Sequence, residues 1–211
     1  MVEQAPIMSW ILTLISFEGV EKKIDRFLFL LDTAKAFDSI DHDWIHDIIK
    51  HLGFPKWFTR FVRGALTEVS VSPFFGRSAH GSIDIERGVK QGCPLSPLLF
   101  LLAYDPLLDS LSRLPHIRCF AFADDLAIVT HDISLIYPAL SLISSFSLVS
   151  GLGINKDKSL VLSTAHPSKH PMIRLGLVQS PWPDLPLRDR VTHLGIVIKK
   201  KKNLWSSPIP I

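Results

Sequence analysis

The sequence predicts an α+β fold in which an antiparallel sheet is covered by helices on one face. Strand-like and helix-like segments follow one another in mixed order, without strict β-α-β alternation. Two apolar runs flank the pair Asp124–Asp125, a pattern typical of a β-hairpin. Hydrophobic residues make up 47% of the 211 residues and charged residues 20%, which favours a buried core and excludes wholesale disorder.

The first expected elements are a strand and a helix. The apolar run Arg26–Leu31 ends at Asp32, which predicts a buried strand with a carboxylate at its tip. Asp41 is a candidate N-cap for a helix over Asp43–His51, and Gly53 ends that helix.

A second helix is expected to begin at Pro55, because proline is favoured in a first helical turn. Two strands, Val69–Phe75 and Ser82–Ile85, are expected around a glycine-containing connection. The predicted apolar face of the helix comprises Trp57, Phe58, Phe61, Val62 and Leu66.

The middle of the chain predicts a long buried helix over Pro97–Leu114, bent at Pro106. The hairpin over Ile117–Val129 follows, and then an amphipathic helix over Ser134–Val149, which Gly151 ends.

The last part of the chain is expected to be less regular. Ser159–Ser163 predicts a strand, and His166–Pro186 is rich in proline and is expected to be less regular. Val191–Ile198 predicts a final strand.

Composition narrows the class of protein. Two cysteines, Cys93 and Cys119, are too few for a disulfide framework, which favours a reduced intracellular compartment. No segment is expected to reach the roughly 18 apolar residues of a membrane span, and Ile7–Phe17 lacks the basic leader of a signal peptide. We therefore expect a protein of the cytoplasm or nucleus without a membrane partner. The net charge of +3 includes the run Lys199–Lys202, either a solvated tail or a phosphate contact.

Three carboxylates stand where strands are expected to end: Asp32, Asp124 and Asp125. Carboxylates on neighbouring strand ends can hold two divalent metal ions about 3.5–4 Å apart for phosphoryl transfer. Aspartate is also a common turn residue, so these residues alone leave both interpretations open. Asp38 and Asp41, close to Asp32, are expected to serve turns or caps.

Five segments in a fixed order resemble the motifs of the reverse transcriptases, and among these the non-LTR retrotransposon type. The segments are LLDTAKAFDSIDH (Leu30–His42), GVKQGCPLSPLLF (Gly88–Phe100), FADD (Phe122–Asp125), SGLGINKDKS (Ser150–Ser159) and HLG (His193–Gly195).

The resemblance implies a polymerase palm with partial fingers and no thumb. It implies RNA-directed DNA synthesis, in which a nucleotidyl group passes from a deoxynucleoside triphosphate to a primer 3′-hydroxyl. Two Mg²⁺ ions, replaceable by Mn²⁺, would be the cofactors, and an RNA template and a DNA primer the partners.

The resemblance also implies roles for single residues. Asp32 and Asp124 would hold both metal ions with Asp125 as the third carboxylate. Lys158 would face the departing pyrophosphate as a general acid, although an exposed strand-edge lysine is the plain alternative.

Around the nucleotide, Phe37 would be an aromatic gate that excludes a 2′-hydroxyl, or else a plain core residue. Gln91 and Gly92 would lie beside the incoming nucleotide. Leu194 and Gly195 would belong to a hairpin that supports the primer, although plain sheet is an alternative there.

These inferences divide the chain into a remnant of fingers or linker (1–25), the palm (26–164), a primer-grip-like hairpin region (165–198) and a basic tail (199–211). The segment 1–25 lacks the basic residues expected of the fingers. A truncated retroelement copy is therefore expected, with an inactive remnant that binds nucleic acid weakly as the alternative function.

Overall fold

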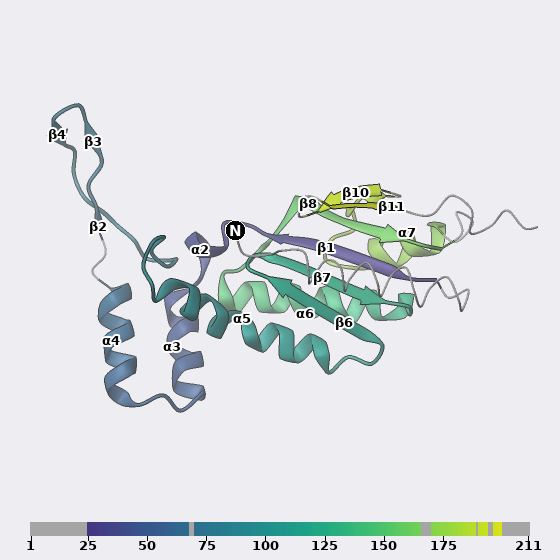
Figure 1. Ribbon diagram of the computed structural model, residues 1–211, viewed down its shortest axis with the longest axis horizontal. Helices are drawn as coiled ribbons and strands as arrows, with labels where there is room; N and C mark the ends of the chain where they lie inside the picture. The colour runs from purple at the N-terminus through teal and green to yellow at the C-terminus, as the bar shows by residue number, and fades with distance from the viewer. Residues whose placement is uncertain (1–24, 68–69, 166–169, 189, 194–195, 200–211) are drawn as a thin grey trace, which may run out of the picture. The chain divides into compact units, whose positions relative to one another are not determined.

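The computed structural model describes residues 25–67, 70–165, 170–188, 190–193 and 196–199 (Figure 1). These residues form two compact units. The sheet unit comprises the chain up to Asp32, Ser110–Leu142 and the residues from Ile154 onward. The helical unit comprises Thr33–Asp109 and Ile143–Gly153.

The sheet unit contains a five-stranded sheet in the order β6-β7-β1-β8-β9. Antiparallel pairing joins β6 to β7 and β7 to β1, whereas β8 and β9 run parallel, so the expected antiparallel sheet has one parallel pair at its edge. The strands are β1 (Phe27–Thr33), β6 (Ile117–Phe122), β7 (Asp125–Thr130), β8 (Ile154–Ser163) and β9 (Leu187–Arg188).

Strand β1 is central in the sheet and is buried along nearly its whole length. Its sequence FLFLLDT shows no alternation of apolar and polar residues, as is typical of a strand covered on both faces. The 3₁₀ turn η1 (Ile133–Leu135) leads into α6 (Ile136–Ser150), whose first turns pack against Phe29 and Ile128. The expectation that a helix covers the sheet is confirmed there.

The segment Ile133–Ser150 corrects one expectation. It is 18 residues long, has a mean hydropathy of 1.7 and carries no charged residue, so by length and composition alone it could cross a membrane. Within the structure 33% of this segment is buried, including Ile136, Ile143 and Phe146, whereas Leu148 is 86% exposed.

The structure differs from the expectations for the last part of the chain at two places. The proline-rich segment, expected to be less regular, contains a helix, α7 (His170–Val178), and Pro171 is compatible with it because it lies in the first turn, where a missing N–H costs nothing. The single strand expected over Val191–Ile198 is instead an antiparallel pair of β10 (Arg190–His193) and β11 (Ile196–Lys199), which agrees with the hairpin that the resemblance implied for this region.

The helical unit begins with α2 (Ala36–Ser39) and α3 (His42–His51). The predicted cap is confirmed: the Asp41 side chain accepts hydrogen bonds from the backbone N–H groups of Asp43 (2.9 Å) and Trp44 (3.3 Å). The long helix α5 (Ser96–Ser112) contains Pro106 and buries Leu99, Phe100, Ala103, Tyr104, Leu107 and Leu111.

Helix α4 (Lys56–Leu66) begins after Pro55 as predicted, but its apolar face is only partly buried. Val62 and Leu66 are buried, whereas Trp57 and Phe61 are 69% and 57% exposed. The aromatic rings pack on one another instead of entering the core. The Phe58 ring stacks on Phe54 with centroids 4.9 Å apart and meets Trp57 edge-on at 5.7 Å.

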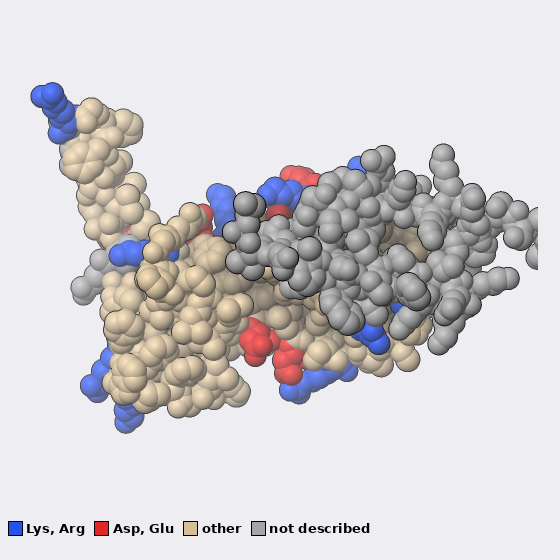
Figure 2. Space-filling model, viewed as in Figure 1, with Lys and Arg blue, Asp and Glu red and all other residues tan. Residues whose placement is uncertain are grey.

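A two-stranded arm follows α4, where two longer strands were expected (Figure 1). Pro73 has no backbone N–H and interrupts the ladder, so the arm is one hairpin whose pairing is divided into two short ladders. Arg77 is the only lysine or arginine between Ser70 and Asp84, and Figure 2 shows basic residues at the tip of the arm. The ladders pair β2 (Ser70–Val71) with β5 (Ile83–Asp84) and β3 (Phe74–Phe75) with β4 (Ser78–Ala79).

Candidate active site

The three predicted carboxylates lie at one end of the sheet unit. Asp32 on β1 stands directly opposite Asp125 on β7 in the antiparallel register. Directly opposed residues point to the same face, with Cβ atoms about 4.5–5.5 Å apart. Asp124 precedes Asp125 in the turn between β6 and β7, where Ala123 adopts a φ of 51°. Pairing of three strands therefore brings together residues that lie about 90 positions apart in the sequence.

Strand β8 adds a cation to this end of the sheet. The Lys158 Nζ lies 3.6 Å from the Asp32 Oδ1, and the Lys158 side chain is 67% exposed against 19% for Asp32. The backbone N–H of Asp32 donates to the Ser159 Oγ at 3.1 Å, and that hydroxyl donates to the Asn155 carbonyl at 2.7 Å. Lys158 thus forms an ion pair with Asp32, and the hydrogen bonds of Ser159 connect the backbone of β1 at Asp32 to β8.

The donor set suits a hard divalent cation. Carboxylate oxygens are the ligands that Mg²⁺ prefers, and two opposed carboxylates repel each other unless a cation lies nearby. Within the described residues, however, no group of three or more His, Cys, Asp or Glu side chains is arranged to hold a metal ion. The strand ends thus supply carboxylates of the kind that bind Mg²⁺, and in this structure the positive charge beside Asp32 comes from Lys158.

A second set of predicted residues lies in the helical unit, where the segment around α2 is bonded to the loop before α5. The Val89 N–H donates to the Phe37 carbonyl at 2.6 Å, and the Gly88 N–H donates to the Ile40 carbonyl at 2.8 Å. Gly88 has a φ of +86°, and a Cβ there would lie 2.7 Å from the Asp38 carbonyl oxygen. Only glycine permits this close approach.

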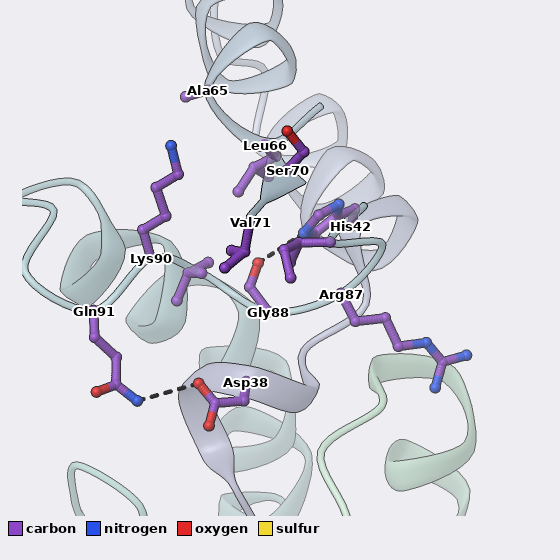
Figure 3. A pocket seen from close by; sticks show the side chains of 12 residues that line it. Asp38, His42, Ala65, Leu66, Ser70, Val71, Arg87, Gly88, Lys90 and Gln91 are labelled. Atoms are coloured by element: carbon purple, nitrogen blue, oxygen red, sulfur yellow. Dashed lines mark hydrogen bonds between the residues drawn. The ribbon is translucent and has the colours of Figure 1, made fainter. Parts of the chain in front are cut away.

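Two side chains strengthen the same connection (Figure 3). The Gln91 Nε2 donates to the Asp38 Oδ1 at 3.1 Å. The His42 Nε2 lies 2.7 Å from the Gly88 carbonyl oxygen, and because a carbonyl only accepts, this nitrogen carries the hydrogen. The adjoining Gly92 has a φ of +85° and nothing within 4 Å of its Cβ position, so open space lies beside it.

Phe37 is half-buried, and its ring stacks on Phe100 with centroids 5.1 Å apart. The Phe100 ring in turn stacks on Tyr104 at 5.4 Å. Phe37 is therefore positioned by its contact with Phe100 of α5, and because the ring is not fully buried, part of it can contact a ligand.

Asp38, His42, Gly88 and Gln91 border a cavity of about 490 Å³ within the helical unit (Figure 3), whereas Phe37 and Gly92 are not among its lining residues. Its charged lining groups are Arg87, Lys90 and Asp38, and Figure 3 shows the Gln91 amide directed toward Asp38. Val71 and Ile85 supply apolar surface. The mixture of cationic, amide and apolar groups suits a ligand with a phosphate and a flat ring.

Sequence reasoning missed the role of two residues. Asp38 was expected to serve a turn or cap: it lies in the first turn of α2 and does not cap it, and its carboxylate also bonds Gln91, which was not expected. His42, at the start of α3, was not expected to bond the loop before α5, and a single histidine beside a cap gives no such signal in a sequence. Leu194 and Gly195 lie outside the described residues, between the paired strands β10 and β11.

A profile of the family described as reverse transcriptase (RNA-dependent DNA polymerase) matches residues 10–198. The chain is 32% identical over 177 residues to a retrovirus-related Pol polyprotein from the type-1 retrotransposable element R2 of Popillia japonica, covering 76% of this chain and 24% of that protein. It is 31% identical over 178 residues to the type-2 element R2DM polyprotein of Drosophila melanogaster, covering 79% of this chain and 17% of that protein.

Solved structures agree on the fold. A telomerase from Candida albicans, in complex with a TWJ fragment of telomeric RNA, superposes with a TM-score of 0.68 at 13% identity, covering 93% of this chain and 33% of that one. An apo telomerase from Candida tropicalis gives 0.64 at 16% identity, covering 92% and 38%. With a palm-like sheet, three carboxylates at its end and a family match over most of its length, this chain belongs to the reverse transcriptase (RNA-dependent DNA polymerase) family, as a domain of the non-LTR retrotransposon type.

Proposed function

We propose that this chain carries out RNA-templated DNA synthesis, the transfer of a nucleotidyl group from a deoxynucleoside triphosphate to a primer 3′-hydroxyl. The observation that carries the proposal is the opposition of Asp32 and Asp125 on paired strands, with Asp124 in the adjoining turn. The chain spans about a quarter or less of the curated R2 relatives described above, so the activity of this domain is proposed from its own residues.

Asp32 and Asp124 are the proposed ligands of two Mg²⁺ ions, with Asp125 as the third carboxylate, and Mn²⁺ can substitute. When bound, such ions offset the negative charge of the triphosphate and favour the ionised primer hydroxyl. Lys158 lies on the Asp32 carboxylate and is the proposed donor of a proton to the departing pyrophosphate. Its high exposure supports that role, since an exposed ammonium can leave Asp32 for a ligand.

The helical unit is proposed to bind the nucleotide. Phe37, held by Phe100, would restrict the space beneath the sugar and disfavour a 2′-hydroxyl. Gln91 would offer an amide for hydrogen bonding, and Gly92 would let the backbone approach the ligand. Leu194 and Gly195 are proposed to support the primer strand.

The proposed partners are an RNA template, a DNA primer and deoxynucleoside triphosphates. The RNA fragment in the Candida albicans telomerase complex supports a nucleic-acid role for this fold. We expect the protein to act in the cytoplasm or nucleus, where such substrates occur, and without a membrane.

A catalytically inactive remnant is the second candidate. One observation favours it: among the described residues, no group of three or more His, Cys, Asp or Glu side chains is arranged to hold a metal ion. In that case the chain would bind nucleic acid weakly at most.

Primer extension by the purified chain on an RNA template, with Mg²⁺ or Mn²⁺, tests the two candidates. Asp124→Ala is expected to abolish extension, whereas Asp184→Ala, at an exposed aspartate remote in sequence, is expected to leave it intact. Absence of extension by a folded, monodisperse wild-type sample would overturn the catalytic proposal in favour of the remnant.

A further inference from the structure

The side chains of Asp38 and Gln91, both exposed, are joined by a hydrogen bond that orients the Gln91 amide. An ionised carboxylate only accepts hydrogen bonds, so the amide must present its NH₂ group to the Asp38 Oδ1, at 3.1 Å. The Gln91 carbonyl oxygen then points away from Asp38, as Figure 3 shows. Without the carboxylate, the two ends of the amide would be free to exchange places.

The two residues are held at this distance by the backbone around them. The backbone bonds from Val89 to Phe37 and from Gly88 to Ile40 lie on either side of Asp38 in sequence and just before Gln91. His42 bonds the Gly88 carbonyl at 2.7 Å. These hydrogen bonds already hold the backbones of the two segments together. The bond between the Asp38 and Gln91 side chains therefore costs little additional conformational entropy.

We propose that Asp38 is a positioning residue for nucleotide binding: it holds the Gln91 amide with its carbonyl oxygen outward, where it accepts a hydrogen bond from a hydroxyl or amino group of the incoming nucleotide. The proposal rests on the proposed function, because Gln91 is taken there as a nucleotide contact. Asp38 itself touches no substrate and acts through Gln91.

Two other roles for Asp38 are less consistent with the geometry. A capping role would direct the carboxylate to a backbone N–H, and no side chain caps α2. A metal-ligand role would have to share a carboxylate whose Oδ1 already accepts a hydrogen bond from the Gln91 amide.

The test is single-nucleotide incorporation by the full chain, with kcat and the KM for deoxynucleotide measured separately. Asp38→Ala is expected to raise that KM about two- to fivefold, since a net hydrogen bond of about 0.5–1 kcal/mol is lost, with kcat changed by less than about twofold. Asp38→Asn can still accept through its Oδ1 and is expected to recover most of the loss. Asp47→Ala, at an exposed aspartate of α3, is the matched control and should behave as wild type.

A double-mutant cycle separates positioning from direct contact. In a Gln91→Ala background, Asp38→Ala is expected to change KM no further, because the residue through which it acts is gone. Additive effects of the two substitutions would overturn the proposal, as would a raised Mg²⁺ requirement of Asp38→Ala, which would mark a metal ligand.

An NMR measurement, which needs no enzymatic turnover, tests the role of Asp38 independently of the proposed polymerase activity. The side-chain ¹⁵N–¹H resonances of Gln91 are expected to move in Asp38→Ala and to stay unchanged in Asp47→Ala. If the wild type extends no primer, the proposed function fails, and this spectrum still decides whether Asp38 orients Gln91. Unchanged Gln91 resonances in Asp38→Ala would overturn the inference in either case.

Discussion

The close approach of Gly88 to the backbone of Asp38 predicts a large loss of stability in Gly88→Ala. The substitution adds a Cβ 2.7 Å from the Asp38 carbonyl oxygen and 2.8 Å from its carbonyl carbon and Cα. These are backbone atoms, which cannot rotate away as the end of a flexible side chain would. A φ of +86° adds a conformational cost of about 1–2 kcal/mol for any residue with a Cβ.

Gly76→Ala is the matched control, because Gly76 also has a positive φ, +67°, but nothing lies within 4 Å of its Cβ position. We expect it to lose only the conformational term of about 1–2 kcal/mol. Gly88→Ala should lose about 2–5 kcal/mol in total, since a further 1–3 kcal/mol is typical of inserting a methyl group into packed surroundings.

Urea denaturation followed by circular dichroism measures both differences, with equal slopes expected for the two variants. Gly88→Ala should also lower nucleotide affinity, because its displacement separates Asp38 from Gln91. Equal losses of stability for Gly88→Ala and Gly76→Ala would refute the reasoning, since the close contact would then contribute nothing.

Three further predictions concern the core, the carboxylates and pH. Ile128→Ala is expected to lower the free energy of unfolding by about 2–5 kcal/mol, because Ile128 is 1% exposed in the sheet core. Lys158→Met should lower it by less than about 1 kcal/mol in metal-free buffer, because the bridge to Asp32 is partly screened by water. Burial, and then Arg63 and Lys50, lower the pKa of His46 below its ordinary 6.5. The unfolded chain therefore takes up this proton first, so stability falls as pH drops below about 6.5, and His46→Leu should remove that part of the slope.

Urea denaturation checks all three predictions, and for His46→Leu the experiment is repeated at a series of pH values. Leu175→Ala, at a 61% exposed position, serves as the control for Ile128→Ala. A loss of several kcal/mol in Lys158→Met would mean that the bridge is far less screened than its exposure indicates. An unchanged pH profile in His46→Leu would contradict the assignment of the slope to this imidazole.

The sheet and its carboxylates could be predicted from the sequence because they depend on local patterns. The apolar run before Asp32 and the hairpin around Asp124–Asp125 place each carboxylate at a strand end. The register that sets Asp32 opposite Asp125 was not predictable, because it follows from which strands pair. The bond from Asp38 to Gln91 joins residues 53 positions apart and likewise depends on tertiary contacts.

Helix periodicity was correct for α4, but periodicity does not reveal how much partner surface is available. Trp57 and Phe61 lie on the predicted face and remain exposed. Helix α7 was missed because proline was taken as a sign of irregular structure. Pro171 lies in the first turn of the helix, a position with which proline is compatible.

The arm made by β2, β3, β4 and β5 has a consequence for self-association. Phe74 and Phe75 are exposed on it by 68% and 72%, and unpaired strand edges with apolar side chains invite pairing with another chain. Pro73 breaks the arm into strands of two residues each, too short to template an added strand. A longer uninterrupted edge with the same aromatics would favour fibrils, and Pro73 removes that uninterrupted edge.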